Sequence, residues 1–149
     1  MEARFLLDTN IFIYIRRNRP AAVFTRFQKL TYGEAVLSVI TYGELAYGAA
    51  KSARRSEAMV QLEELRQALP VTALPATAAE IYGAARADLE SRGQQIGNND
   101  LWIAAHALAS NLILITNNEK EFARVKGLKI QLGQIAVQQV DNSQVLLSL

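Results

Sequence analysis

Short apolar runs alternate along the chain with longer stretches in which apolar residues recur every three or four positions. A short apolar run bounded by polar residues indicates a strand buried on both faces, and the longer spacing indicates an amphipathic helix. We therefore expect strands at residues 5–7, 35–39, 71–74, 112–115 and 128–130.

Helical patterns fill the intervals between these runs. Met59, Leu62, Leu65 and Leu69 show the spacing most plainly, and Gly93 stands where a helix C-cap would lie. The expected helices are 11–17, 21–30, 41–50, 56–69, 77–91, 100–109 and 118–125. Strands that alternate with helices predict an α/β fold with a mostly parallel central sheet and helices on both faces.

Composition favours one globular domain. The chain has 149 residues, of which 50% are hydrophobic and 20% charged, so it is long enough to bury about two-thirds of its unfolded surface. We place this domain at residues 1–130, because the periodic pattern ends there, and we leave 131–149 as a tail of unassigned structure. The net charge of +2 is compatible with nucleic acid without arguing for it.

Several classes of protein are excluded by what the chain lacks. It has no cysteine, which rules out a disulfide framework, a thiolate zinc site and a cysteine nucleophile. Its N-terminus does not resemble a signal peptide, and no apolar run approaches the roughly 20 residues of a membrane helix. We expect a soluble cytoplasmic protein.

Three acidic residues lie at the junction between an expected strand and the next helix, or at the start of an expected helix. They are Asp8, Glu44 and Asp100. A parallel sheet gathers such positions at the carboxyl ends of its strands, where open α/β folds bind ligands. Three carboxylates would repel one another there unless a cation lay between them, and Mg²⁺ prefers oxygen ligands of this kind. The pattern indicates metal-assisted chemistry on phosphates.

Each acid also has a purely structural interpretation. Asp8 could cap the helix that starts near Ile11, and Asp100 could cap the helix that follows it. Thr41 and Glu44 have the spacing of a capping box. Three coincidental caps from distant segments are less economical than one shared site, so we favour the site.

Polar neighbours could support these acids. Thr9 and Asn10 follow Asp8 directly and could orient a carboxylate or a metal-bound water. Asn118 and Glu121 again have capping-box spacing after the clearest strand. For Glu121 we favour a structural role, and for Asn118 an outer-sphere role at the metal site.

His106 is the single histidine, six residues after Asp100. Six residues correspond to a rise of about 9 Å along a helix, which is too far for both to share one ion at the helix start. We interpret His106 as a buried, hydrogen-bonded residue and Trp102 as packing on the sheet. A mechanism that needs a pair of histidines is excluded.

Two basic clusters follow helices that begin beside a candidate ligand. Their members are Arg16, Arg17 and Arg19, then Lys51, Arg54 and Arg55. A cluster of charge is usually a solvated surface, but cations beside an acidic metal centre are also what a phosphodiester backbone requires. We favour a nucleic-acid role for both clusters.

At this point four segments of the chain resemble one known family. They are Leu-Leu-Asp-Thr-Asn at 6–10, Glu44 at a helix start, Ile-Gly-Asn-Asn-Asp-Leu-Trp-Ile-Ala-Ala-His-Ala at 96–107, and Ile-Thr-Asn-Asn at 115–118 followed by Glu121 and Phe122. In this order they look like a PIN domain, and more narrowly like the VapC toxins of bacterial toxin–antitoxin systems. The resemblance covers residues 4–130.

The resemblance implies a three-layer α/β/α fold and an endoribonuclease that depends on Mg²⁺ or Mn²⁺. By matching motifs, Asp8, Glu44 and Asp100 would be the metal-binding carboxylates. Many PIN domains carry a fourth acid where this chain has Asn118, which places a full second metal site in doubt.

The resemblance also implies partners. VapC toxins form homodimers, and a VapB-type antitoxin silences them by covering the acidic pocket in a toxin–antitoxin hetero-oligomer. Their substrates are RNA, and similar toxins attack structured RNA such as the initiator tRNA. The tail at 131–149 does not match the usual ending of these toxins.

Two alternatives remain. A small metal-dependent phosphatase could use Asp8 as its nucleophile, although Asn10 stands where such enzymes commonly carry a second acid. A catalytically inactive PIN-like binding module could keep the acids only as caps. Calorimetry with Mn²⁺ separates these cases, because a helix cap needs no metal.

Overall fold

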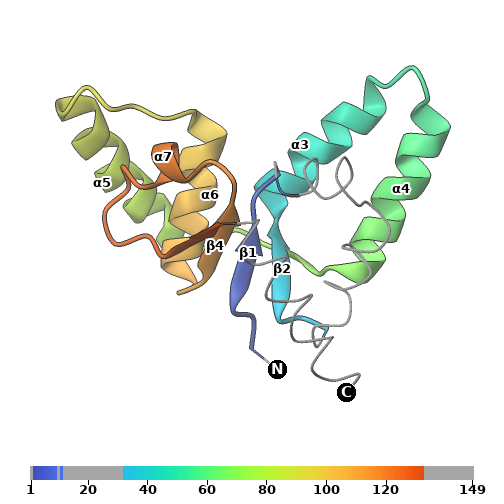
Figure 1. The fold of residues 1–149 in the computed structure, drawn as a ribbon, viewed down its shortest axis with the longest axis horizontal. Helices are drawn as coiled ribbons and strands as arrows, with labels where there is room; N and C mark the ends of the chain where they lie inside the picture. The colour runs from blue at the N-terminus through green and yellow to red at the C-terminus, as the bar shows by residue number, and fades with distance from the viewer. Residues whose placement is uncertain (1, 10, 12–31, 133–149) are drawn as a thin grey trace.

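The computed structural model describes residues 2–9, 11 and 32–132 of the chain (Figure 1). Its strands are β1 (Phe5–Leu7), β2 (Ala35–Ser38), β3 (Val71–Thr72), β4 (Ile113–Thr116) and β5 (Ile130–Leu132). Its helices are α3 (Val39–Ala50), α4 (Arg55–Ala68), α5 (Thr77–Ser91), α6 (Asn98–Ala109) and α7 (Glu119–Phe122).

The strands form one five-stranded sheet in the order β3-β2-β1-β4-β5, and every neighbouring pair is parallel. Strand β1 lies at the centre, where Leu6 pairs with Val36 of β2 and with Leu114 of β4. The predicted α/β fold with a parallel sheet is confirmed, and its crossover helices carry the chain between parallel strands.

The core consists of two layers, one on each face of the sheet. Successive residues of a strand point to opposite faces, so Leu7 and Leu37 pack with Leu65 of α4, whereas Leu6 packs on the other face with Ile103 of α6. Figure 1 shows the α3–α4 pair on one side of the sheet and α5, α6 and α7 on the other. This is the expected three-layer arrangement.

Some expectations fall on residues outside the described part of the chain. They concern the helices at 11–17 and 21–30, the tail beyond residue 132, and the side chains Asn10, Arg16, Arg17 and Arg19. Among the described helices, none is both long and apolar enough to cross a membrane.

The alternative interpretation of Thr41 and Glu44 as a capping box is wrong. Ser38 is the N-cap of α3, because its hydroxyl oxygen accepts a 3.1 Å hydrogen bond from the backbone N–H of Ile40. The helix therefore begins at Val39, which ends β2 one residue earlier than expected. Thr41 lies inside the first turn, where its buried hydroxyl has no hydrogen-bond partner within the described residues.

Helix α6 also begins earlier than the sequence pattern predicts. Gly97 is its N-cap residue and Asn98 its first residue, so Asp100 lies within the first turn and does not cap the helix. Trp102 stacks on the ring of Tyr82, with 3.8 Å between ring centroids and 9° between ring planes. This contact joins α6 to α5, and the expectation that Trp102 packs on the sheet stays a prediction.

Candidate active site

The carboxyl edge of the sheet brings the acidic segments together. Asp8 directly follows β1, and its N–H donates to the carbonyl of Ile115 at 2.9 Å, which continues the pairing with β4. Helix α3, which carries Glu44, follows β2, and helix α6 carries Asp100 in its first turn. The topology thus delivers three distant segments to one region, as the parallel sheet predicts.

Asp8 is fixed by two hydrogen bonds. Its side chain is 1% exposed, with Oδ1 accepting from the N–H of Thr9 at 2.8 Å and Oδ2 accepting from the hydroxyl of Thr116 at 2.9 Å. Burial raises the pKa of Asp8, and the two hydrogen bonds oppose that rise. Thr116 is a site residue that the sequence analysis missed.

Thr9 connects Glu44 to the Asp8 carboxylate. The hydroxyl of Thr9 donates to Oε1 of Glu44 at 3.2 Å, so one residue contacts the carboxylates of both β1 and α3. The expectation that Thr9 lies beside the acids and orients a carboxylate agrees with this contact.

Asp100 carries the largest electrostatic perturbation of the group. Its pKa is raised from 3.8 to about 6, first by burial and then by the negative charges of Asp8, Glu121 and Glu44. Burial alone raises the pKa of a carboxyl group, and nearby carboxylates raise it further. Four acids from four segments therefore share one electrostatic environment.

Glu121 is the fourth acid, and its hydrogen bonds are not those of the expected capping box. Asn118 makes no side-chain cap for α7; its side-chain amide donates to Oε2 of Glu121, while its backbone N–H donates to the hydroxyl oxygen of Thr116 at 2.9 Å. Oε1 of Glu121 accepts from the N–H of Gly97 at 3.2 Å. The expected capping box is therefore wrong, and Glu121 connects α7 to the start of α6.

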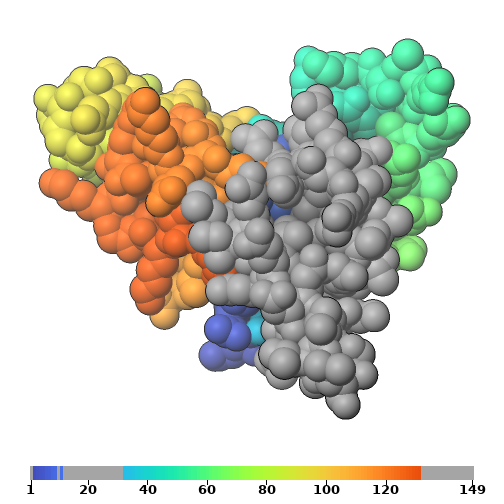
Figure 2. All heavy atoms as spheres, in the orientation of Figure 1, coloured from blue at the N-terminus to red at the C-terminus, as the bar shows by residue number. Residues whose placement is uncertain are grey.

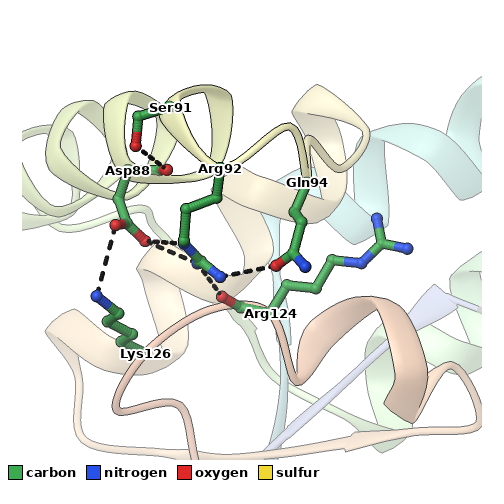
Figure 3. Close-up of polar contacts among 6 residues, drawn as sticks. All are labelled: Asp88, Ser91, Arg92, Gln94, Arg124 and Lys126. Atoms are coloured by element: carbon green, nitrogen blue, oxygen red, sulfur yellow. Dashed lines mark hydrogen bonds and ion pairs between the residues drawn. The ribbon is translucent and has the colours of Figure 1, made fainter.

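An ion-pair network holds the loop that leads into α6 (Figure 3). The guanidinium of Arg92, at the end of α5, donates to Asp88 at 2.7 Å, to Gln94 at 2.7 Å and to the carbonyl of Arg124 at 2.8 Å. Lys126 approaches the other oxygen of Asp88 at 3.5 Å.

A second guanidinium completes this network. Arg124 donates to the carbonyl of Gln95 at 3.1 Å. Gly93 has a φ of 65°, the left-handed conformation that glycine adopts without strain, and it turns the chain after α5 as expected. The network ties the loop at 92–97 to the segment after α7, immediately before the helix that carries Asp100.

The donor set fits a hard divalent cation in chemistry and charge. All of its ligating atoms are oxygens, and the charges that raise the pKa of Asp100 are all carboxylates. In the described part of the chain, no three acidic or histidine side chains are close enough to enclose an ion as they stand. Mg²⁺ usually keeps several waters and is bound by one or two protein carboxylates, so a hydrated ion suits such a site.

His106 is buried away from solvent and has a hydrogen-bond partner. Its Nδ1 lies 2.8 Å from the hydroxyl oxygen of Ser38, the residue that caps α3. Burial lowers the pKa of His106, which favours the neutral ring. The interpretation of His106 as a structural residue is confirmed.

The second basic cluster lies at the turn between α3 and α4. Lys51 is the C-cap residue of α3, and its ammonium lies 4.8 Å from the ring centroid of Tyr47. Arg54 forms a long 3.9 Å ion pair with Glu57, and Arg55 is exposed at the start of α4. An RNA-binding role for Lys51, Arg54 and Arg55 stays a prediction.

Comparison with known proteins places this arrangement in a wider group. A family model described as the PIN domain matches residues 5–128. Ribonuclease VapC1 of Haemophilus influenzae strain R2866 is 41% identical over 128 residues, which cover 85% of this chain and 96% of that protein. The tRNA(fMet)-specific endonuclease VapC of Shigella flexneri is 40% identical over 128 residues, which cover 86% of this chain and 96% of that protein.

A solved structure agrees with these sequence matches. DNA-bound VapBC from Salmonella typhimurium matches with a TM-score of 0.80 and 35% identity, covering 88% of this chain and 98% of that chain. Each similarity spans nearly the whole of the relative, so it concerns more than one shared motif.

Proposed function

The chain belongs to the PIN-domain family, among the VapC ribonuclease toxins, and we propose that it is a metal-dependent endoribonuclease that cleaves RNA at the acidic cluster. The observation that carries this proposal is that Thr9 contacts the carboxylates of both Asp8 and Glu44 at the carboxyl edge of the sheet. Asp100 belongs to the same group, since its pKa is raised to about 6 by burial and then by three carboxylates, Asp8 and Glu44 among them. Such a concentration of negative charge is costly to folding unless a cation or a proton compensates for it.

We assign the metal ligands to Asp8, Glu44 and Asp100. Mg²⁺ or Mn²⁺ bound there would lower the pKa of a coordinated water and stabilise charge on the phosphate that is cleaved. Thr116 and Thr9 hold the Asp8 carboxylate in one orientation, and Thr9 also donates to Glu44. Preorganisation of this kind reduces the reorganisation required at the moment of reaction.

Outside the ligand set, polar residues keep the acids in place. Asn118 donates to Glu121 and to Thr116, and Thr116 in turn donates to Asp8. We propose that Asn118, Thr9 and Asn10 act around the ion and not on the substrate.

We propose that the RNA backbone runs over basic residues of the two clusters. The residues of this proposed surface are Arg16, Arg17, Lys51, Arg54 and Arg55. Phosphate groups are attracted to such cations without regard to base sequence. The Shigella relative is named for tRNA(fMet), so a structured tRNA is the first substrate class to test.

The relatives also suggest partners. The similar structures include VapBC-1 from nontypeable Haemophilus influenzae, DNA-bound VapBC from Salmonella typhimurium, and a member of the VapBC family of toxin–antitoxin systems from Mycobacterium tuberculosis. We propose that this chain forms a homodimer and a hetero-oligomer with a VapB-type antitoxin whose cationic groups meet the acidic cluster. We further propose that residues 1–130 form the single PIN-like domain and that 131–149 are appended to it.

The test is cleavage of total bacterial RNA by the purified chain with Mg²⁺ or Mn²⁺, beside an EDTA control. We expect discrete fragments with the wild type and at least a hundred-fold loss of rate in Asp8→Asn and Glu44→Gln. Glu64→Gln is the matched control, since Glu64 is an exposed acid of α4, and it should cleave like the wild type.

The outcomes separate the alternatives. Wild-type cleavage by Asp8→Asn would refute the proposed site. A folded protein that binds Mn²⁺ by calorimetry without cleaving RNA would favour a phosphatase, for which a chromogenic phosphate ester is the substrate to try. A folded protein that neither binds Mn²⁺ nor cleaves RNA would favour a binding module.

A further inference from the structure

One face of α3 links the acidic cluster to the basic turn. At 100° per residue, five positions after Ile40 fall within a stripe of about 140°, which we call the α3 stripe. Its members are Gly43, Glu44, Tyr47, Gly48 and Lys51. Ile40, which precedes them at the same angle, packs against the core. From Glu44 to Lys51 the helix rises about 10 Å. Helices α3 and α4 form one projecting end of the molecule (Figures 1 and 2), so this stripe leads from the acids towards an accessible end.

Tyr47 is the prominent side chain of the stripe. It is 66% exposed, so it contributes little to the core, and the ammonium of Lys51 lies 4.8 Å from its ring centroid. An exposed aromatic ring beside a cation is the pairing with which proteins stack a nucleobase and hold its phosphate.

The two glycines of the stripe have no packing explanation in the described part of the chain. A Cβ built on Gly43 or on Gly48 would meet no atom within 4 Å. Glycine inside a helix is destabilising, because it gains backbone freedom in the unfolded chain. Here no side chain projects from the helix at either glycine, so a ligand beside Tyr47 can approach the helix backbone closely.

We propose that the α3 stripe binds a nucleotide of a single-stranded RNA segment beside the cleaved bond. The base stacks on Tyr47, its phosphate meets Lys51, and the ribose-phosphate backbone passes over Gly43 and Gly48. This inference rests on the proposed ribonuclease function and extends it to the substrate-binding surface. Lys51, together with Arg54 and Arg55 beyond it, makes this end of the stripe positively charged. Positive charge attracts the phosphates of RNA, whereas it would repel the cationic groups of a protein partner that binds the acidic cluster.

The first test measures binding of bulk bacterial tRNA by fluorescence anisotropy, in full-length Asp100→Asn protein to prevent cleavage. Adding Tyr47→Ala should raise the Kd roughly 5- to 100-fold, the range that loss of one base-stacking contact produces. Tyr47→Phe keeps the ring and should stay within about twofold of the parent. Lys51→Ala should weaken binding and reduce the slope of log Kd against log salt by about 1.

Tyr32 provides the matched control. It is 65% exposed, as Tyr47 is, but it precedes β2 at the amino edge of the sheet, away from the acids. Tyr32→Ala should bind tRNA like the parent. Both alanine variants should keep the melting temperature of the parent, because neither ring is buried.

The second test uses the same substitutions in otherwise wild-type protein with Mn²⁺ and bulk tRNA. Tyr47→Ala should raise KM and leave the single-turnover rate at saturating protein within about threefold, since the ring binds the substrate and holds no ion. Unchanged tRNA binding and KM in Tyr47→Ala, with an active wild type, would overturn the stripe and leave the ribonuclease function standing.

Two further results are distinguishable. If Tyr47→Ala binds tRNA normally but resists inhibition by a co-expressed antitoxin, the stripe is a protein-binding surface and the RNA proposal is wrong. If the wild type neither binds nor cleaves tRNA or total RNA, the proposed function fails, and this inference fails with it.

Discussion

Asp8 and Asp100 experience the same acidic cluster in different ways. Asp8 is almost fully buried, and two hydrogen bonds favour its charged form. The pKa of Asp100 is raised first by burial and then by three carboxylates. The pKa of Asp100 therefore responds to the neighbouring carboxylates. Titration of Asp100 is the measurement that detects their repulsion.

The first prediction concerns pH. The pKa of Asp100 in the folded protein, about 6, lies above its ordinary value of 3.8, so the native state binds a proton more readily than the unfolded chain. Its contribution to stability is present below about pH 4 and is lost as the pH rises through 6. In EDTA, the melting temperature of Asp100→Asn should therefore fall less than that of the wild type between pH 4 and 6.5.

An exposed acid supplies the comparison for this measurement. Glu64→Gln on α4 is the appropriate control, because Gln has the shape of Glu just as Asn has the shape of Asp. Its melting profile should follow that of the wild type. Parallel profiles for Asp100→Asn and the wild type would show that Asp100 is not perturbed in this way.

The second prediction concerns Thr41. Its buried hydroxyl loses hydration on folding and gains no hydrogen bond from the described residues in return. Thr41→Val replaces the hydroxyl with a methyl group of similar shape, and it should raise the free energy of unfolding by about 1 kcal/mol. Urea denaturation measures the difference.

Thr72 offers the matched case with a satisfied hydroxyl. It donates to the carbonyl of Leu37 at 2.9 Å, across the β2–β3 pair. Thr72→Val should lower the free energy of unfolding by about 1 kcal/mol, opposite in sign to the effect at position 41. Equal effects of the two substitutions would contradict the account of Thr41.

At the scale of elements, the start of α6 is fixed from outside the helix. Its N-cap is Gly97, which has no side chain to cap the helix, and the N–H of Gly97 donates instead to Glu121. The preceding loop is held by Arg92 and Arg124. These contacts place the first turn of α6, and with it Asp100, relative to α7.

The third prediction tests Arg92 as a positioning residue. Arg92→Ala removes hydrogen bonds to Asp88, Gln94 and the carbonyl of Arg124, and it should cost about 1 kcal/mol of stability. It should also raise the Kd for Mn²⁺, measured by calorimetry well below the melting temperature, because Asp100 is less firmly placed. Arg92→Lys should restore part of the stability and little of the metal affinity, since lysine lacks the planar fork.

Arg86 is the control for this substitution. It lies on the same helix, and its hydrogen bonds within the described residues go to Glu90 and Tyr82, both on α5. Arg86→Ala should leave the Kd for Mn²⁺ unchanged. An equal Kd in Arg92→Ala and the wild type would assign the network to stability alone.

At the scale of the whole molecule, the sheet collects its acids from segments that are distant in sequence. A bound cation would therefore contact β1, α3 and α6 together and oppose their separation on unfolding. Ligand binding to the native state alone stabilises it by about 2.7 kcal/mol at a hundred times the Kd.

The fourth prediction follows from this linkage. Mn²⁺ at about a hundred times its Kd should raise the melting temperature by about 5–10 °C, given the usual sensitivity of a domain of this size. EDTA should reverse the shift, and Asp8→Asn should abolish most of it. A shift that persists in Asp8→Asn would locate the ion elsewhere.

The order of elements and the parallel sheet could be predicted from the sequence because each depends on a local pattern. Apolar runs such as 5–7 indicate buried strands. Strands that alternate with helices predict a parallel sheet, because each helix carries the chain back to start the next strand in the same direction. That topology places Asp8 and the segments that carry Glu44 and Asp100 at one edge. The candidate acids were therefore accessible to sequence reasoning, together with Thr9.

Helix starts and the supporting contacts were decided only by the tertiary structure. Ser38 and Thr41 are both good caps, and the choice of Ser38 depends on how β2 ends against its neighbours. Glu121 and Thr116 enter the site through the packing of α7 and β4 against other segments, and no short sequence spacing encodes such contacts. The sequence by itself determined which segments meet; the packing of side chains around them decided which residues hold the acids in place.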